Sequence, residues 1–300
     1  RAFDMMNLGL SYLDHGLYSE AAIQFNEALY NQTENLDFHF FMDFFPQDSI
    51  LTQNMINAFS FQLANDSTGA SYFFLALFDK SGDDAYEYIQ NYIYHRPSDL
   101  RGYLLYSELL YNNNEWFDAL FQYQKVLWLD NNNIDAQFGI GLCLYHLQEF
   151  NDAVSAFRKT LKLDSYNHSA YYYLGRSLMA KNNFREAIPN LTQSLLLDPE
   201  NSDTYFNLGK SYFETGKIIQ AREAFNRTIR IKPQHGSAYY HIGLINEDIM
   251  EIEKAVHAYT QAREYSPEIE DVHYRLGMLL FRTGELKQAM EPLRQFIIYQ

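Results

Sequence analysis

Apolar side chains recur along most of this chain at the spacing of amphipathic helices, and the pattern is clearest between residues 168 and 201. The first set in that stretch falls at i, i+3, i+4 and i+7: Tyr171, Leu174, Gly175 and Leu178. A second set follows the polar break at 181–183: Phe184, Ala187, Ile188, Leu191 and Leu195. Each set forms one apolar stripe on one helix, so the stretch is predicted to fold as a helical hairpin.

The predicted hairpin ends at Asp198-Pro199, because proline lacks a backbone donor and disfavours helical geometry in the residue before it. We expect the next helix to begin near Ser202, a residue type that is favourable as a helix cap.

The same pattern returns every 34 residues from position 66 onward, with units predicted to start at 66, 100, 134, 168, 202, 236 and 270. Small residues occupy the eighth position of the last six units: Ser107, Gly141, Gly175, Gly209, Gly243 and Gly277. Alanine occupies the twentieth: Ala119, Ala153, Ala187, Ala221, Ala255 and Ala289. Bulky residues occupy the twenty-fourth: Tyr123, Phe157, Leu191, Phe225, Tyr259 and Leu293. A large residue beside a small one lets facing helices interlock, so we predict that each hairpin is closely packed at these positions.

Two segments precede the regular part. Residues 2–35 are predicted to form a first hairpin, with one stripe through Met5 and Gly9 and another through Phe25. Residues 36–65 lose the phase, and we expect an irregular helical segment there with a helix from about Ile50 to Ala64. This segment is interpreted either as a divergent repeat that buries its own phenylalanines or as an inserted patch for a partner.

Charge and composition restrict the class of partner. The formal net charge of −15 disfavours nucleic acid and anionic membrane surfaces, which bind clustered lysine and arginine. No apolar run reaches the length of a membrane span, so we expect no membrane insertion in this segment. The single cysteine, Cys143, excludes an intrachain disulfide and a thiolate metal site, and is interpreted as a small core residue or as a reactive thiol.

The repeats resemble the tetratricopeptide repeat family. The resemblance lies in the 34-residue period, in the Leu-Gly pairs at 8–9, 174–175, 208–209 and 276–277, and in Pro97, Pro199, Pro233 and Pro267 at position thirty-two. It implies an all-α, right-handed superhelical solenoid of about eight helix-turn-helix repeats plus one irregular unit, forming a single solenoid over 1–300. It also implies a concave groove, lined by the first helices, that holds a peptide or a helix of a partner protein.

The resemblance implies which residues line this groove. They are mainly aromatic, with two cations near the middle: Phe138, Tyr145, Tyr172, Arg176, Met179, Phe206, Lys210, Phe213, Tyr240 and Tyr274. Aromatic and arginine side chains often carry binding energy at interfaces. Two alternatives stay open, namely that the aromatic residues only pack the repeats and that Arg176 and Lys210 are solvated charges. The Lys/Asn pair by which some family members bind chaperone C-termini is absent, as Phe138 and Leu142 show for one unit.

We therefore predict a noncatalytic protein-interaction scaffold with no cofactor and no metal site. The sequence contains no zinc-protease HExxH motif, glycine-rich phosphate loop or GxSxG elbow. Two alternatives are the substrate-recruiting region of a larger enzyme and a carrier of small ligands. Because the last predicted helix ends in apolar residues, we also expect that the natural chain continues or that the C-terminal repeat self-associates.

Overall fold

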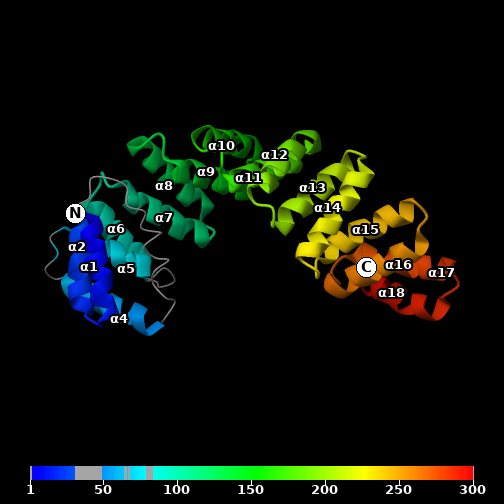
Figure 1. Ribbon diagram of the computed structural model, residues 1–300, viewed down its shortest axis with the longest axis horizontal. Coiled ribbons are helices and arrows are strands. Elements are labelled where there is room, and N and C mark those ends of the chain that lie inside the picture. Colours follow the sequence, from blue (N-terminus) through cyan, green and yellow to red (C-terminus); the bar gives the residue numbers. More distant parts are fainter. Residues whose placement is uncertain (1, 31–48, 64–65, 67, 79–83, 300) are drawn as a thin grey trace. The chain divides into compact units, whose positions relative to one another are not determined.

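A computed structural model of the chain describes residues 2–30, 49–63, 66, 68–78 and 84–299. Within these residues there are seventeen α-helices and no strand, so the predicted all-α class is confirmed. The helices belong to two compact units, an N-terminal unit (Arg1–Leu147) and a C-terminal unit (Gln148–Gln300), each of which is a stack of helices in contact with their sequence neighbours (Figure 1).

The N-terminal unit contains eight of the described helices. They are α1 (Ala2–Asp14), α2 (Tyr18–Tyr30), α4 (Ser49–Leu63), α5 (Ala70–Phe78), α6 (Ala85–His95), α7 (Leu100–Asn112), α8 (Trp116–Leu129) and α9 (Ile134–His146). The C-terminal unit contains the other nine. They are α10 (Phe150–Leu163), α11 (His168–Ala180), α12 (Phe184–Leu197), α13 (Ser202–Glu214), α14 (Ile218–Ile231), α15 (Gly236–Asp248), α16 (Ile252–Tyr265), α17 (Glu270–Arg282) and α18 (Leu286–Tyr299).

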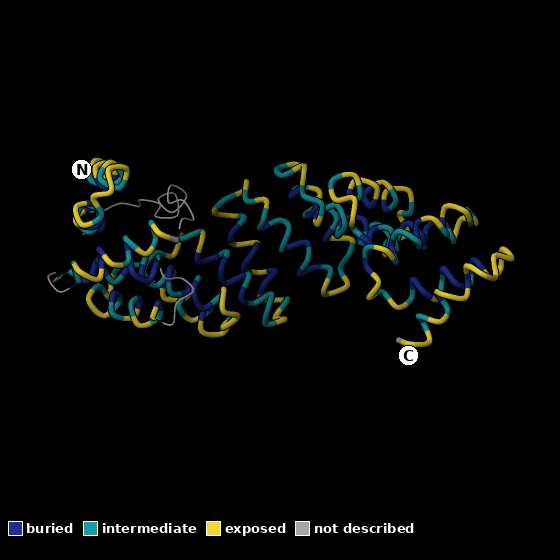
Figure 2. The backbone as a smooth tube through the Cα atoms, turned by 90° about the horizontal axis from the view of Figure 1, so that it is seen from below, coloured by how far each residue is buried: buried dark blue, intermediate teal, exposed yellow. Residues whose placement is uncertain are grey.

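From α7 onward the helix bounds follow the 34-residue period. First helices of 13 residues begin at position one of each repeat, and second helices of 14 residues begin at position seventeen. Figure 2 shows that the buried backbone lies where helices of one unit face each other. That all repeats form a single solenoid stays a prediction.

The predicted close packing within each hairpin is confirmed in the C-terminal unit. The bulky residue at position twenty-four covers the glycine at position eight of its own repeat: Leu191 covers Gly175, Phe225 covers Gly209, Tyr259 covers Gly243 and Leu293 covers Gly277. The covering side chains Leu191, Phe225 and Tyr259 are fully buried. Glycine is therefore required at these positions because the facing side chain occupies the space of a β-carbon.

The structure corrects the predicted capping residue of helix α13. Helix α13 does begin at Ser202, but its cap is Asn201, whose Oδ1 accepts a hydrogen bond from the backbone N–H of Thr204 at 2.9 Å. Asn133 and Asn167 cap α9 and α11 in the same way. The cap is thus the last residue of the preceding period, where an extended backbone precedes the first helical residue.

The turn between the two helices of a repeat also has one fixed geometry. Its residue at position fifteen adopts a left-handed backbone, with positive φ in each of the six repeats from residue 100 onward: Asn114, Gln148, Asn182, Gly216, Met250 and Gly284. Glycine and asparagine tolerate this conformation, whereas Gln148 and Met250 adopt it at a steric cost.

The irregular segment lies partly outside the described residues. Its described part is α4, which begins at Ser49 close to the predicted start and packs against α2 and α5. Met55 and Phe59 are fully buried, and the Phe59 ring stacks on Phe74 with centroids 4.7 Å apart. These contacts agree with a divergent repeat that buries its own phenylalanines, although Phe61 remains exposed.

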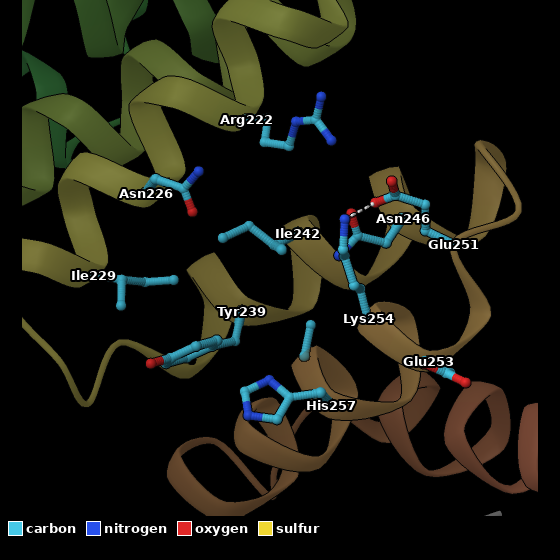
Figure 3. A pocket seen from close by; sticks show the side chains of 11 residues that line it. Arg222, Asn226, Ile229, Tyr239, Ile242, Asn246, Glu251, Glu253, Lys254 and His257 are labelled. Atoms are coloured by element: carbon cyan, nitrogen blue, oxygen red, sulfur yellow. Dashed lines mark ion pairs between the residues drawn. The ribbon is translucent and has the colours of Figure 1, made fainter.

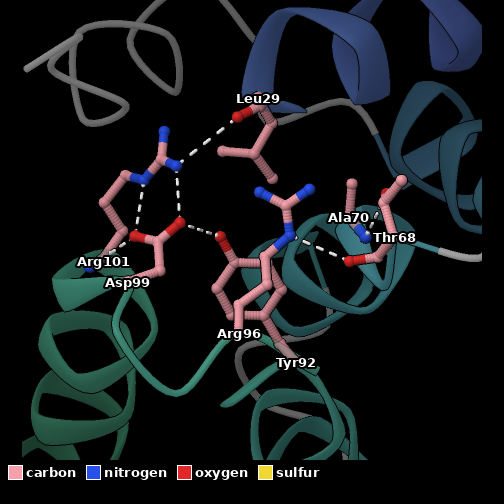
Figure 4. A network of polar contacts seen from close by, with 7 residues as sticks. All are labelled: Leu29, Thr68, Ala70, Tyr92, Arg96, Asp99 and Arg101. Carbon is pink, nitrogen blue, oxygen red and sulfur yellow. Dashed lines mark hydrogen bonds and ion pairs between the residues drawn. The ribbon is translucent and has the colours of Figure 1, made fainter. Parts of the chain in front are cut away.

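A partly buried polar network joins α2, α6 and the start of α7 (Figure 4). Tyr92 donates from its hydroxyl to Asp99 at 2.6 Å, and the Arg101 guanidinium donates to both Asp99 oxygens and, at 3.4 Å, to the Leu29 carbonyl. Burial alone would raise the pKa of Asp99, but the hydrogen bonds from Arg101 and Tyr92 outweigh burial and lower it.

Candidate functional site

The predicted groove residues fall on the first helices of the repeats, and the structure divides them between the two units. Eight of them lie on α11, α13, α15 and α17 of the C-terminal unit. We name this set the first-helix face: Tyr172, Arg176, Met179, Phe206, Lys210, Phe213, Tyr240 and Tyr274. Tyr274 is exposed and the other seven are half-buried.

Both predicted cations of the first-helix face lie over aromatic rings. The guanidinium carbon of Arg176 is 5.5 Å from the Tyr172 ring centroid, and Nζ of Lys210 is 5.9 Å from that of Phe206. These distances fall within the range of cation–π attraction. Each cation thus lies over an aromatic residue one turn earlier on its own helix, and its role in binding a partner stays a prediction.

Tyr172 also connects α11 to α13. Its hydroxyl accepts a hydrogen bond from Nδ2 of Asn207 at 3.5 Å, and the same nitrogen donates to the Asp203 carbonyl at 2.8 Å. Burial raises the pKa of Tyr172, and Arg176 partly opposes this effect. The phenol is therefore neutral and can donate a hydrogen bond at neutral pH.

A half-buried histidine of α15 contacts aromatic rings of α13 and α14. The His241 ring stacks on Phe225 with centroids 4.9 Å apart and contacts Phe206 at 5.8 Å and Phe213 at 5.6 Å. Its Nδ1 has no hydrogen-bond partner among the described residues. Burial lowers the pKa of His241 to about 4, with smaller contributions from Lys210 and His235, so the ring is neutral at pH 7.

A polar network connects α15, α16 and α17. Tyr240 donates to Oδ2 of Asp271 at 2.6 Å, Arg275 pairs with Asp271 and, at 3.0 Å, with Glu247, and Tyr259 donates to Glu247 at 2.7 Å. Burial raises the pKa of Tyr240 to about 12, and its hydrogen bond to Asp271 adds to the shift. The network fixes the rotamer of Tyr240 on the first-helix face.

The remaining predicted residues are less tightly held. Tyr274 contacts Phe296 of α18, with ring centroids 5.2 Å apart, and Met179 lies half-buried one turn beyond Arg176. Phe138 and Tyr145 lie on α9 of the N-terminal unit, and the Tyr145 ring contacts that of His146 with centroids 5.6 Å apart. The His146 ring stacks on Trp116 at 4.8 Å and hydrogen-bonds Tyr111 at 3.0 Å.

From the sequence, no contacts were assigned to the sixth position of the repeat. In the last three repeats this position is polar, as Asn207, His241 and Arg275, and each side chain connects its helix to a neighbouring helix. Earlier repeats carry Leu105, Gly139 and Tyr173 there. In the sequence, the change from apolar or small residues to polar residues at this position was the signal that could have indicated these contacts.

The described residues contain no group of three or more His, Cys, Asp or Glu side chains that could hold a metal ion. None of the described helices combines the length and hydropathy needed to cross a membrane.

The repeats match known family models. Models described as tetratricopeptide repeat match residues 178–242 and 251–298, and a model described as anaphase-promoting complex, cyclosome, subunit 3 matches 112–194. No curated protein sequence matches this chain.

Several solved structures are similar. YrrB, described as a TPR protein with an unusual peptide-binding site, is 25% identical with a TM-score of 0.55, covering 67% of this chain and 100% of that one. MamA is 30% identical with a TM-score of 0.51, covering 54% of this chain and 95% of that one. The C-terminal part of a TPR repeat-containing protein from Cytophaga hutchinsonii is 16% identical with a TM-score of 0.61, covers 74% and 93% of the two chains, and shows the fold alone. This chain belongs to the tetratricopeptide repeat family, whose members are protein-interaction scaffolds.

Proposed function

We propose that this chain is a noncatalytic scaffold whose C-terminal unit binds an extended peptide or a helix of a partner protein against the first-helix face. The observation that carries the proposal is the presence of aromatic side chains on four successive first helices, half-buried on α11, α13 and α15 and exposed on α17, with Arg176 and Lys210 over Tyr172 and Phe206. Rigid aromatic and arginine side chains contribute binding energy at a low cost in conformational entropy.

The contacts beneath the face support this proposal. The rings of Phe206 and Phe213 contact the His241 ring, and Tyr240 donates a hydrogen bond to Asp271. A surface whose side chains are already fixed loses little freedom when a partner binds. The similarity to YrrB, whose structure is described as having an unusual peptide-binding site, agrees with peptide binding in this fold.

A comparison of captured partners tests the proposal. The full chain and its Tyr172→Ala/Phe206→Ala variant would be used as baits in extracts of the native source, with bound proteins identified by mass spectrometry. A Tyr166→Ala/Leu196→Ala variant is the matched control, because both side chains are exposed and lie outside the first-helix face. We expect the first variant to lose partners that the control retains. Identical partner sets for all three proteins would show that the first-helix face does not bind the captured partners.

We also propose that the chain self-associates through its last repeat. Helix α18 exposes Met290 and Ile297, two turns apart on one face, with 71% and 72% of their surfaces accessible. A second copy of the chain could cover these side chains. Sedimentation of the chain and of a Met290→Glu/Ile297→Glu variant tests this, since a wild-type monomer at all concentrations would contradict it.

A further inference from the structure

Helix α14 is basic, although the chain as a whole is acidic. Residues 217–232 contain five cations and one acid, in a protein of net charge −15. Three of the cations are Arg222, Arg227 and Arg230, which lie on α14 itself. Three other arginines of the C-terminal unit do pair with acids: Arg158 with Glu186, Arg263 with Glu291, and Arg275 with Glu247 and Asp271. Among the described residues, no acid forms an ion pair with any of the three arginines of α14.

These arginines surround a hollow on the surface of α14. The hollow has a volume of about 320 Å³, and its lining includes all three arginines together with Asn226 and Ile219. Ile219 is 75% exposed, so an apolar side chain stands at the edge of the cationic surface. We name Arg222, Arg227 and Arg230, with this hollow, the arginine surface.

A second and larger hollow adjoins the first. Its volume is about 620 Å³, and Arg222 and Asn226 line both hollows (Figure 3). Figure 3 shows Arg222 and Asn226 on α14 on one side, with Tyr239 and Ile242 of α15 and His257 of α16 around the rest of the hollow. The two hollows therefore adjoin each other at Arg222 and Asn226, and we name them together the cleft, which is cationic along α14 and apolar along α15.

The acids of the cleft do not neutralise its arginines. Glu251 is paired with Lys254, whose Nζ lies 3.0 Å from Oε2. Glu223 and Glu253 remain on the lining, against three arginines. The cleft thus keeps unpaired guanidinium groups, which match carboxylates in geometry and bind them through two parallel hydrogen bonds.

We infer that this cleft binds an acidic segment of a partner protein, with carboxylates on the arginine surface and an apolar side chain over Tyr239 and Ile242. Charge complementarity selects this occupant, since the arginines lack acids of their own within the described part of the chain. Tyr239 lines the cleft, whereas the adjacent Tyr240 belongs to the first-helix face. The acidic segment therefore occupies a surface separate from the one in the proposed function.

Fluorescence anisotropy with a defined probe tests the inference. The probe is a fluorescein-labelled peptide of alternating glutamate and leucine, compared with the same peptide carrying glutamine in place of glutamate. We expect the full chain to bind the glutamate peptide and to bind it more weakly as NaCl is raised from about 0.05 M to about 0.5 M, because salt screens exposed charges. Failure to bind, or equal binding of the glutamine peptide, would overturn the inference.

Matched variants assign the binding to the arginine surface. We expect at least about a tenfold loss of affinity for the glutamate peptide in the variant Arg222→Glu/Arg227→Glu/Arg230→Glu, because charge-assisted hydrogen bonds are lost. Lys159→Glu/Lys162→Glu/Arg185→Glu changes the net charge equally at exposed sites on α10 and α12 and should alter affinity by no more than about twofold. If the first variant is not folded by circular dichroism, the corresponding Arg→Gln triple variant replaces it. Equal losses in both variants would show a nonspecific charge effect and would contradict the inference.

Two further measurements test whether the cleft binds nucleic acid and whether the peptide binds the first-helix face. Single-stranded oligothymidylate that competes at lower concentration than the glutamate peptide would indicate a nucleic-acid surface and would overturn the inference. The Tyr172→Ala/Phe206→Ala variant should bind the glutamate peptide normally. If that variant alone loses binding, the peptide lies on the first-helix face, and the inference fails while the proposed function gains support.

Discussion

Leu191 lies directly over Gly175, so that a β-carbon placed on the glycine would be 2.7 Å from both Cγ and Cδ2 of the leucine. Such an approach is much shorter than an ordinary van der Waals contact. Gly209 and Phe225 repeat the arrangement one period later. The close approach of the two helices thus depends on the absence of a side chain at one position, even though glycine weakens a helix by about 0.8–1 kcal/mol relative to alanine.

Replacing Gly175 tests this packing. We expect Gly175→Leu to lower the free energy of unfolding by roughly 1–3 kcal/mol through overpacking, measured by urea denaturation. A double-mutant cycle of Gly175→Ala with Leu191→Ala should show coupling of about 0.5 kcal/mol or more, because truncation of the leucine side chain removes its clash with the new methyl group. Strict additivity would contradict the arrangement.

The turn residue Met250 provides a stabilising prediction. Its φ of 62° is unfavourable for methionine, and its side chain is 78% exposed, so little packing is lost on replacement. We expect Met250→Gly to raise the free energy of unfolding by about 0.5–1 kcal/mol, since relief of left-handed strain exceeds the added chain entropy. Asn182→Gly at the equivalent turn is the control and should change stability less, because asparagine tolerates this conformation.

The sequence predicted the parts of the fold that depend on spacing within one repeat. The helical period, the small residue at Gly175 and the large residue at Leu191 all follow from local patterns, and the structure confirms them. The cap Asn201 was overlooked because its neighbour Ser202 is also a favourable capping type, and only backbone geometry distinguishes them.

The candidate site was less predictable because its contacts cross between repeats. Position in the period placed Tyr172 and Phe206 on first helices, but not the residues that hold them. Whether His241 meets Phe206, or Arg275 meets Glu247, depends on how successive hairpins stack. The cleft on α14 was overlooked for a related reason, since Arg222 and His257 are 35 residues apart and line one hollow only in the folded unit.

The thiol of Cys143 is expected to be inert in the native protein. Its surface is fully buried, and burial raises its pKa to about 12, so that almost no thiolate forms at pH 8. We predict that an aromatic disulfide reagent labels the native chain at least about a hundredfold more slowly than the chain in guanidinium chloride. Equal rates would instead support the reactive-thiol interpretation.

The half-buried ring of His241 predicts a fall in stability as the solution becomes mildly acidic. Its folded pKa of about 4 lies below the ordinary histidine value, so the unfolded chain binds more protons between about pH 6.5 and pH 4. Above about pH 6.5 the histidine is neutral in both states and does not lower the free energy of unfolding. As the pH falls toward 4, the free energy of unfolding decreases by roughly 2–3 kcal/mol. Urea denaturation at pH 7 and pH 5 measures this change, with His241→Phe as the matched variant. Phenylalanine keeps the stacking on Phe225 but cannot be protonated, so its stability should depend less on pH over the same interval. The same slope in both proteins would show that His241 is not the titrating group.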